Sequence, residues 1–123
     1  MAGKPVHIEI AGGDTARARE FWSGLFGWQW QDYSGPVEYH MTQIVPDQTG
    51  GAIYAAEGDK RGLRVYFDVD DVNAGAAKVR ELGGEAGEGL PVPGMGWFAV
   101  CTDTEGNEFG LWQTDPEAPT PEM

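Results

Sequence analysis

The feature that most constrains the fold is an internal repeat. The stretch VHIEIAGGDTARAREFWSGLFGW begins at Val6, and the stretch LRVYFDVDDVNAGAAKVRELGGE, which begins at Leu63, aligns with it without a gap. Asp14 then falls on Asp71. Each stretch has the pattern of a strand, a short turn, a helix and a glycine stop. A pattern of this length that occurs twice indicates two copies of one supersecondary unit.

Both predicted helices have signals at their ends. Asp14 and Asp71 stand where an N-cap carboxylate can accept hydrogen bonds from the free amides of the first helical turn. Glycines at 27 and at 83–84 can adopt the left-handed conformation that ends a helix. One apolar stripe of the first helix consists of Ala18, Phe21, Trp22 and Leu25. We expect Phe21, Trp22 and Trp28 to be core residues or dimer contacts.

Strand-like stretches follow each helix. After the first helix they are 28–33, 37–45 and 50–56, and after the second they are 85–92, 96–103 and 108–114. The pattern predicts one domain over residues 1–123, made of two βαβββ modules at 4–56 and 62–114. The tail, 115–123, holds three prolines and three acidic residues, so we expect it to be flexible.

Composition excludes several classes of function. The net charge is −12, from 20 acidic and 8 basic residues, and this charge would repel nucleic acid. No apolar run approaches the roughly 20 residues that a membrane span needs. The N-terminus lacks the apolar stretch of a signal peptide, and the single cysteine, Cys101, has no partner for an internal disulfide. We expect a cytoplasmic protein that contacts neither nucleic acid nor membrane.

The doubled pattern resembles the vicinal oxygen chelate superfamily, which includes glyoxalases, bleomycin-resistance proteins and extradiol dioxygenases. The residues that carry the likeness are VHIEIAGGDTARAREFWSGLFGW and, near the end, GWFAVCTDTEGNEFGLWQ, and the likeness covers about residues 4–114. It implies an α+β fold in which two βαβββ modules form a cupped mixed sheet around a cleft, with the helices on the outer face. It also implies a homodimer. It does not fix the chemistry, because members differ widely in activity.

In metal-dependent members, the first, fourth, fifth and eighth strands supply ligands to a divalent ion. Of these positions only the first keeps a suitable residue, His7. The fourth falls in GGAIYA, the fifth on Arg64, which cannot ligate a metal, and the eighth on Gly110. We therefore expect no cofactor. The alternative is a rearranged site for Zn, Ni, Fe or Mn that uses His7, Glu9 and His40.

The resemblance, with strand alternation, gives the residues expected to line the cleft. His7 and Glu9 are the candidate catalytic residues. The candidate ligand-binding residues are His40, Tyr54, Arg64, Tyr66, Asp68, Trp97 and Trp112. Aromatic faces can hold a flat ring or a cation, and an arginine can hold an anion. Alternatively, Arg64 pairs internally with Glu9 or Asp68 and only holds the sheet.

Three functions remain open. The first is a metal-free binding protein for a small organic molecule, of the bleomycin-resistance kind that confers antibiotic resistance. The second is a lyase, isomerase or dioxygenase, with or without metal, that uses His7 or Glu9 as a base. The third is a non-catalytic, dimerising accessory domain. We favour the first, because the expected cleft is aromatic and the metal ligands are missing.

Overall fold

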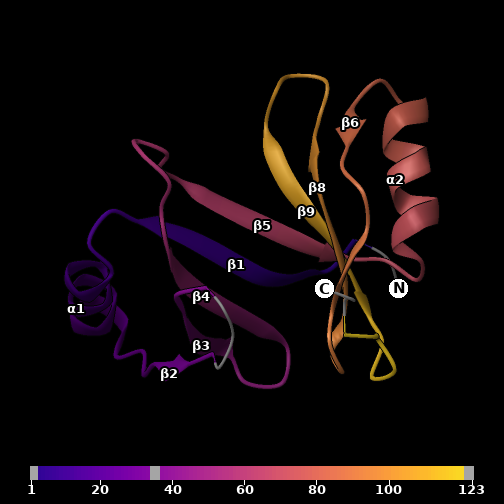
Figure 1. Ribbon diagram of the computed structural model, residues 1–123. Helices are drawn as coiled ribbons and strands as arrows, with labels where there is room; N and C mark the ends of the chain where they lie inside the picture. Colours follow the sequence, from indigo (N-terminus) through magenta and orange to yellow (C-terminus); the bar gives the residue numbers. More distant parts are fainter. Residues whose placement is uncertain (1–2, 34–36, 121–123) are drawn as a thin grey trace. The chain divides into compact units, whose positions relative to one another are not determined.

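The computed structural model describes residues 3–33 and 37–120 and divides the chain into two compact modules (Figure 1). The first module is residues 7–64, and the second comprises residues 3–6 and 65–120. The divisions fall inside two strands, β1 (Pro5–Gly12) and β5 (Leu63–Asp68). Each module has the strand–helix–strands order that the repeat predicts, so the predicted α+β fold of two βαβββ modules is confirmed.

The first module contains α1 (Thr15–Phe26), β2 (Gln31–Asp32), β3 (Tyr39–Val45) and β4 (Thr49–Ala55) besides its part of β1. Its strands lie in the order β2-β3-β4-β1. β1 is parallel to β4, and the other pairs are antiparallel. The strand predicted at 28–33 shrinks to two paired residues.

The second module contains α2 (Val72–Glu81), β6 (Glu85–Ala86), β7 (Leu90–Val92), β8 (Gly96–Thr102) and β9 (Glu108–Thr114) besides its part of β5. Its strands lie in the order β5-β9-β8-β6, and β7 also pairs with β8. The single strand predicted at 85–92 is interrupted between β6 and β7. The interruption holds Gly87 and Gly89, and glycine weakens the interior of a strand.

The predicted helix ends are confirmed. Asp14 Oδ1 accepts a hydrogen bond of 3.0 Å from the backbone N–H of Arg17, and Asp71 Oδ1 accepts two from the start of α2. Gly27 ends α1 with a φ of 74° and donates to the carbonyl of Ser23. Neither helix in the described part of the chain has the length and apolar character that a membrane-spanning helix needs.

The two helices pack differently on their own sheets. α2 lies along β6, β8 and β9 and buries Val72 and Ala76 against a core that includes Ala99, Cys101 and Leu111 (Figure 1). α1 has no buried residue, although Ala18 lies close to Gly12 of β1. The small residues of α2 pack against its sheet, whereas the bulky apolar residues of α1 are not buried against the sheet of the first module.

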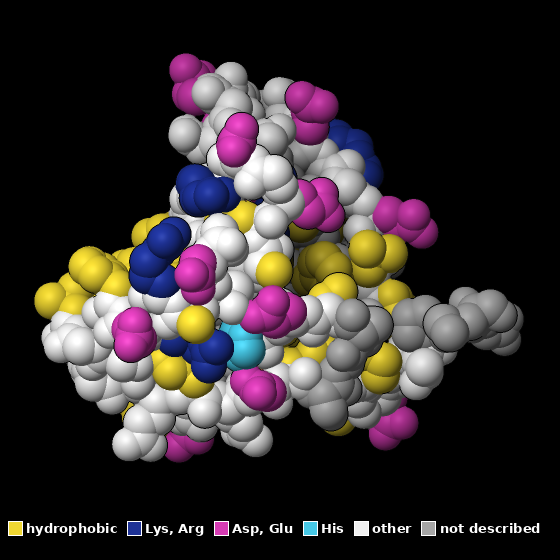
Figure 2. Space-filling view, turned by 60° about the vertical axis from the view of Figure 1, so that its left-hand side comes forward, with side chains coloured by type: hydrophobic (Ala, Val, Ile, Leu, Met, Phe, Trp, Pro, Cys, Tyr) yellow, Lys and Arg dark blue, Asp and Glu magenta, His cyan; other side chains and the backbone are white. Residues whose placement is uncertain are grey.

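Two of the four residues of the apolar stripe of α1 are exposed. Phe21 is 63% exposed and Leu25 is 58% exposed, so neither is a core residue of this chain. Trp22 and Trp28 are half-buried, because their rings stack on each other with centroids 5.5 Å apart. Exposed hydrophobic side chains gather in patches on the face of the molecule drawn in Figure 2.

The first part of the tail predicted to be flexible makes hydrogen bonds with the second module. Asp115 accepts a hydrogen bond of 3.0 Å from the Trp97 indole, and its backbone N–H donates to Met95. Ala118 is 6% exposed and pairs with the backbone of Gly94. The end of the tail, 121–123, lies outside the described residues.

In the second module, the ring of Tyr66 occupies the space where residue 110 has no side chain. A Cβ added to Gly110 would stand 2.7 Å from Cγ of Tyr66 and closer still to two other ring carbons. Tyr66 is only 5% exposed and packs edge-on against Phe98. Glycine at 110 is therefore required by its neighbour.

We predict that Gly110→Ala lowers the free energy of unfolding by about 1–3 kcal/mol, since the added methyl group overpacks a filled site. Urea denaturation measures this change. In a Tyr66→Ala background the same substitution should cost much less, because the obstructing ring is gone. Gly24→Ala is the control: its Cβ meets no atom within 4 Å, and it should stabilise the helix by about 0.5–1 kcal/mol. Equal effects of Gly110→Ala in both backgrounds would contradict the packing argument.

Candidate functional site

The strand register of the first module sorts its side chains onto two faces. His7 lies opposite Gly50 and Glu9 opposite Ala52, while Tyr39 lies opposite Tyr54. Paired residues of neighbouring strands point to the same side of a sheet, and successive residues alternate. One face, here called the polar face, therefore carries His7, Glu9, Tyr39 and Tyr54. The other carries Ile10, Ile53 and His40.

Three side chains of the polar face form a chain of hydrogen bonds. The Tyr39 hydroxyl donates to Glu9 Oε2 at 2.8 Å and lies 2.7 Å from His7 Nε2. An ionised carboxylate has no proton to give, so the single hydroxyl proton of Tyr39 points to Glu9. His7 must then donate its own Nε2–H to the Tyr39 oxygen. The two rings are also stacked, with centroids 6.2 Å apart.

The other carboxylate oxygen of Glu9 pairs with Arg64. Arg64 Nη1 donates to Glu9 Oε1 at 2.8 Å, and the two side chains are 15% and 14% exposed. Of the two internal pairings that the sequence left open for Arg64, this is the one the structure has. A pair that is largely removed from water holds its geometry, because separating the charges would leave one of them uncompensated. We call His7, Tyr39, Glu9 and Arg64 the polar network.

Burial keeps His7 neutral. It lowers the pKa of His7 from the usual value, and the nearby Glu9 carboxylate only partly offsets the effect. At neutral pH the network therefore contains an uncharged imidazole, a phenol, a carboxylate and a guanidinium. Such a chain can present hydrogen-bond donors and acceptors to a ligand, and a neutral imidazole can also accept a proton.

His40 does not join this network, because it lies on the opposite face. Its Nδ1 is 2.6 Å from Asp32, and its Nε2 is 2.7 Å from Glu38. The hydrogen bond from the Thr15 hydroxyl is the largest cause of the lowered pKa of Glu38, and the hydrogen bond with His40 is the second. His40 thus holds β2 and β3 together beside the start of α1. The sequence-based set of His7, Glu9 and His40 is not brought together.

In the second module, Tyr66, Phe98 and Trp112 share one face of the sheet, because Phe98 lies opposite Trp112 and Tyr66 opposite Gly110. Trp97, the neighbour of Phe98, points to the other face and packs on the core beneath α2. Trp97 therefore does not share the sheet face of Trp112. Asp68 accepts the backbone N–H of Lys4 at 2.8 Å and so ties down the start of the chain.

The residues present do not fit the metal site that the sequence resemblance implies. At the eighth-strand position the ring of Tyr66 fills the space where a ligand side chain would stand. At the fifth-strand position Arg64 is a permanent cation. Among the described residues, no group of three His, Cys, Asp or Glu side chains is arranged to hold a metal ion.

Sequence reasoning missed two residues, Tyr39 and Phe98. Tyr39 follows Glu38 and precedes His40, and Phe98 follows Trp97, so each missed residue is the direct neighbour of a predicted one. Neighbours along a strand point to opposite faces, and the prediction assigned the wrong one of each pair to the face in question. The signal that could have corrected these assignments is pairing: if Trp112 faces one side, its antiparallel partner on β8 faces the same side.

We predict that His7 titrates below pH 6.5, the ordinary value for histidine. Between its lowered pKa and about pH 6.5, the unfolded chain binds a proton at His7 that the folded chain does not, so the free energy of unfolding falls as the pH drops through this range. NMR titration of the imidazole signals gives the pKa. Urea denaturation at two pH values, compared with the same measurement on His7→Gln, isolates the contribution of His7. A His7 pKa at or above 6.5 would refute the prediction.

Comparison with known proteins gives a consistent family. The model of the glyoxalase-like domain matches residues 7–112. The anthracycline biosynthesis protein DnrV of Streptomyces peucetius is 29% identical over 90% of this chain, which spans 47% of DnrV, about half of that relative. A glyoxylase-like domain-containing protein of Didymella fabae is 34% identical over 90% of this chain and 94% of its own length.

Solved structures agree on the fold. A methylmalonyl-CoA epimerase in complex with methylmalonyl-CoA and NH4+ superimposes with a TM-score of 0.72 and covers 97% of this chain and 100% of its own. The epimerase from Mycobacterium tuberculosis gives the same TM-score over 92% of this chain and 89% of its own. Their identities are 20% and 16%, so this likeness concerns the fold alone. The family model matches most of this chain, so the chain belongs to the glyoxalase-like domain family.

Proposed function

We propose that this protein binds a small organic molecule on the polar face of its first module, without a metal ion. The observation that carries the proposal is the polar network. It places four hydrogen-bonding side chains next to one another on a sheet face, and two of them are a charge pair that needs no ligand to neutralise it. A ligand would therefore be recognised by hydrogen bonds and ring contacts rather than by charge.

The chemistry of the network favours a flat molecule that bears oxygen atoms. The rings of Tyr39 and Tyr54 lie on neighbouring strands and offer apolar faces, while the Tyr39 hydroxyl and the His7 imidazole offer polar edges. The names of the relatives point the same way, since DnrV belongs to anthracycline biosynthesis and a structural neighbour is complexed with a CoA ester. Arg64 acts in this proposal by positioning Glu9 and does not clamp an anion itself.

Binding should depend on the Tyr39 hydroxyl and on no metal. We expect dialysis against EDTA to leave binding unchanged, and Tyr39→Phe to weaken it about tenfold, because the substitution breaks two hydrogen bonds of the network. Isothermal titration with an anthracycline, methylmalonyl-CoA and bleomycin measures both effects. Bleomycin tests the antibiotic-resistance function expected from the sequence.

Tyr33→Phe is the matched control, since it removes a hydroxyl for which the described chain offers no hydrogen-bond partner and keeps the edge-on ring contact with Tyr39. Binding that is lost with EDTA and restored by a divalent metal would overturn the metal-free proposal. Equal binding by the Tyr39→Phe and Tyr33→Phe variants would overturn the role of the network.

A second function is favoured by the lowered pKa of His7. A neutral imidazole linked through a phenol to a carboxylate can take a proton from a carbon next to a carbonyl group, the step of an isomerase. Titrations repeated in deuterium oxide separate the two functions. Exchange of the ligand's acidic carbon-bound proton that disappears in His7→Gln would identify an enzyme, whereas binding without exchange would identify a binding protein.

We also infer that the protein forms a homodimer through the exposed stripe of α1. Phe21, Leu25 and Phe26 are each more than half exposed, and aromatic side chains of this size are enriched in interfaces. Together with the half-buried Trp22 they make a continuous apolar surface on one helix. The third function left open by the sequence, a dimerising accessory domain, would use the same surface.

We expect Leu25→Asp to convert the dimer to a monomer, because it places a charge in the middle of this surface. Light scattering coupled to size-exclusion chromatography measures the mass. Leu82→Asp is the control, since Leu82 is 66% exposed and lies in the second module. A wild-type monomer, or a dimer that survives Leu25→Asp, would contradict the inference.

We place the protein in the cytoplasm, as the sequence suggests. Cys101 is 2% exposed, and burial raises the pKa of its thiol. A buried thiol of this kind acts as a small apolar residue in the core of the second module and needs no oxidising compartment.

A further inference from the structure

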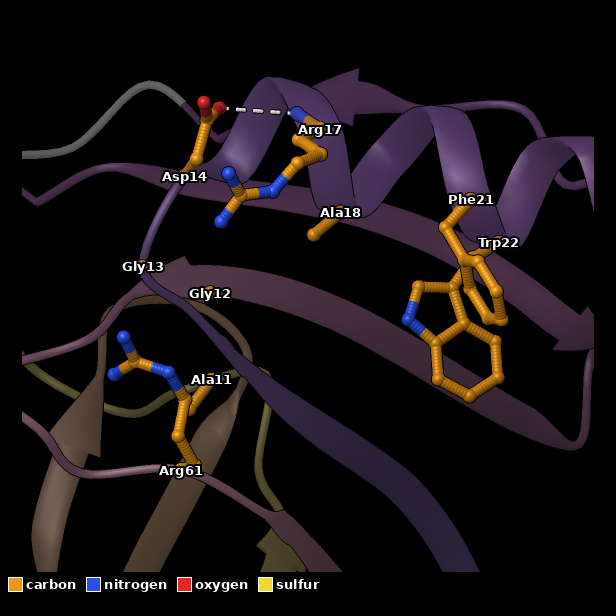
Figure 3. Close-up of a pocket in the computed structure, with 9 residues that line it drawn as sticks. All are labelled: Ala11, Gly12, Gly13, Asp14, Arg17, Ala18, Phe21, Trp22 and Arg61. Atoms are coloured by element: carbon orange, nitrogen blue, oxygen red, sulfur yellow. Dashed lines mark hydrogen bonds between the residues drawn. The ribbon is translucent and has the colours of Figure 1, made fainter.

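The first module has a second recess, which the polar network does not use. It lies at the turn between β1 and α1 and has a volume of about 360 Å³ (Figure 3). Small residues of the turn form its floor, two arginines stand at one end, and two aromatic side chains stand at the other. None of the residues that line it belongs to the polar network. Its volume is within the usual range for a small-molecule pocket.

The guanidinium of Arg61 is held in place before any ligand arrives. Its Nη1 donates to the carbonyls of Lys60 and Gly58, at 2.7 and 3.2 Å. The Nη2 group lies against Gly13, where a Cβ would collide with it. The absence of a side chain at residue 13 is therefore what allows Arg61 to reach the turn. A fixed guanidinium binds an anion at lower entropic cost than a mobile one.

Arg17 supplies a second positive charge at the same place. It projects from the first turn of α1, and both guanidinium groups are directed toward Gly13, one from each side (Figure 3). Within the described residues, neither arginine is paired with a carboxylate. Asp14 also lines the recess, but its carboxylate accepts the backbone N–H of Arg17 and so caps the helix. Two cations and one engaged carboxylate leave a net positive charge, in a protein of net charge −12.

The other end of the recess is apolar. Phe21 and Trp22 follow one helical turn after Arg17 and Ala18, and their rings meet edge to face with centroids 5.5 Å apart. Ala18 is small, so it leaves the space between the arginines and the rings open. A ligand that fills the recess must therefore be anionic at one end and apolar at the other.

We propose that this recess binds a small organic anion, a phosphate or carboxylate joined to a flat apolar group. Arg61 and Arg17 pair with the oxygens of the anion, and the apolar group lies against Phe21 and Trp22. Guanidinium groups suit both anions, because their N–H donors match two oxygens at once. This site is independent of the ligand binding proposed for the polar network, since the two share no residue, whereas Phe21 and Trp22 also belong to the apolar surface inferred for the dimer.

The test uses phenyl phosphate, benzoate and inorganic phosphate as probes, at physiological salt so that the overall negative charge is screened. Chemical shifts of the Gly12 and Gly13 amides locate binding, and isothermal titration measures affinity. We expect phenyl phosphate or benzoate to move these signals and to bind more tightly than inorganic phosphate. Whichever of phenyl phosphate and benzoate binds more tightly shows whether the recess prefers a phosphate or a carboxylate. No shift at Gly12 and Gly13 with either aromatic probe would overturn the proposal.

Two variants separate the guanidinium charge from its position. Arg61→Gln should weaken binding at least about tenfold. Gly13→Ala keeps both charges but displaces the end of the Arg61 side chain, so it should weaken binding similarly and leave the thermal midpoint unchanged. Lys78→Gln removes one positive charge in the other module and should bind as the wild type does. Unchanged affinity in Arg61→Gln and Gly13→Ala would overturn the proposal.

Phe21→Ala tests the apolar end. The Phe21 side chain is exposed in the single chain, so the substitution does not threaten the fold, and light scattering on the variant shows whether the inferred dimer persists. It should reduce the advantage of phenyl phosphate over inorganic phosphate, without changing the affinity for inorganic phosphate. An unchanged advantage would show that the aromatic wall takes no part, and the ligand class would then be wrong.

Discussion

The half-buried carboxylate of Glu9 determines the arrangement of the polar face. A carboxylate with little access to water needs a cation and hydrogen-bond donors, and Arg64 and Tyr39 supply them. Because Tyr39 must donate to Glu9, its oxygen is left to accept from His7, and this fixes which nitrogen of His7 carries the proton. One carboxylate thus orients three neighbours on three strands. These hydrogen-bond directions determine which donors and acceptors the polar face presents to another molecule.

The two modules show how one repeated pattern can serve different ends. The helices begin at matching aspartates and follow matching strands. α2 presents Val72 and Ala76 to its sheet and seals the core, whereas α1 carries large aromatic side chains that remain accessible. The repeat therefore conserves the backbone path while the size of the side chains decides the role of each helix. This explains why exposed aromatic side chains lie on α1.

The sequence was sufficient for the fold because the relevant signals are local. Strand alternation, the two N-cap aspartates and the glycine stops act within a few residues, and the structure has them where they were expected. The candidate site was harder, because it depends on which face each strand presents. His40 and Trp97 were chosen for their side-chain chemistry, but register places their neighbours Tyr39 and Phe98 on the relevant faces. Register is set by pairing between distant segments, which a single sequence does not display.

The close fit of Tyr66 against Gly110 restricts how this protein can change. The ring of Tyr66 already occupies the space next to residue 110, so a side chain added there has to displace the ring. A gain of a ligand there has to be preceded by loss of the tyrosine ring, and loss of the ring alone leaves a cavity. Each single step therefore lowers the stability of the second module. The side chains at 66 and 110 are therefore constrained jointly, and a change at either position favours a compensating change at the other.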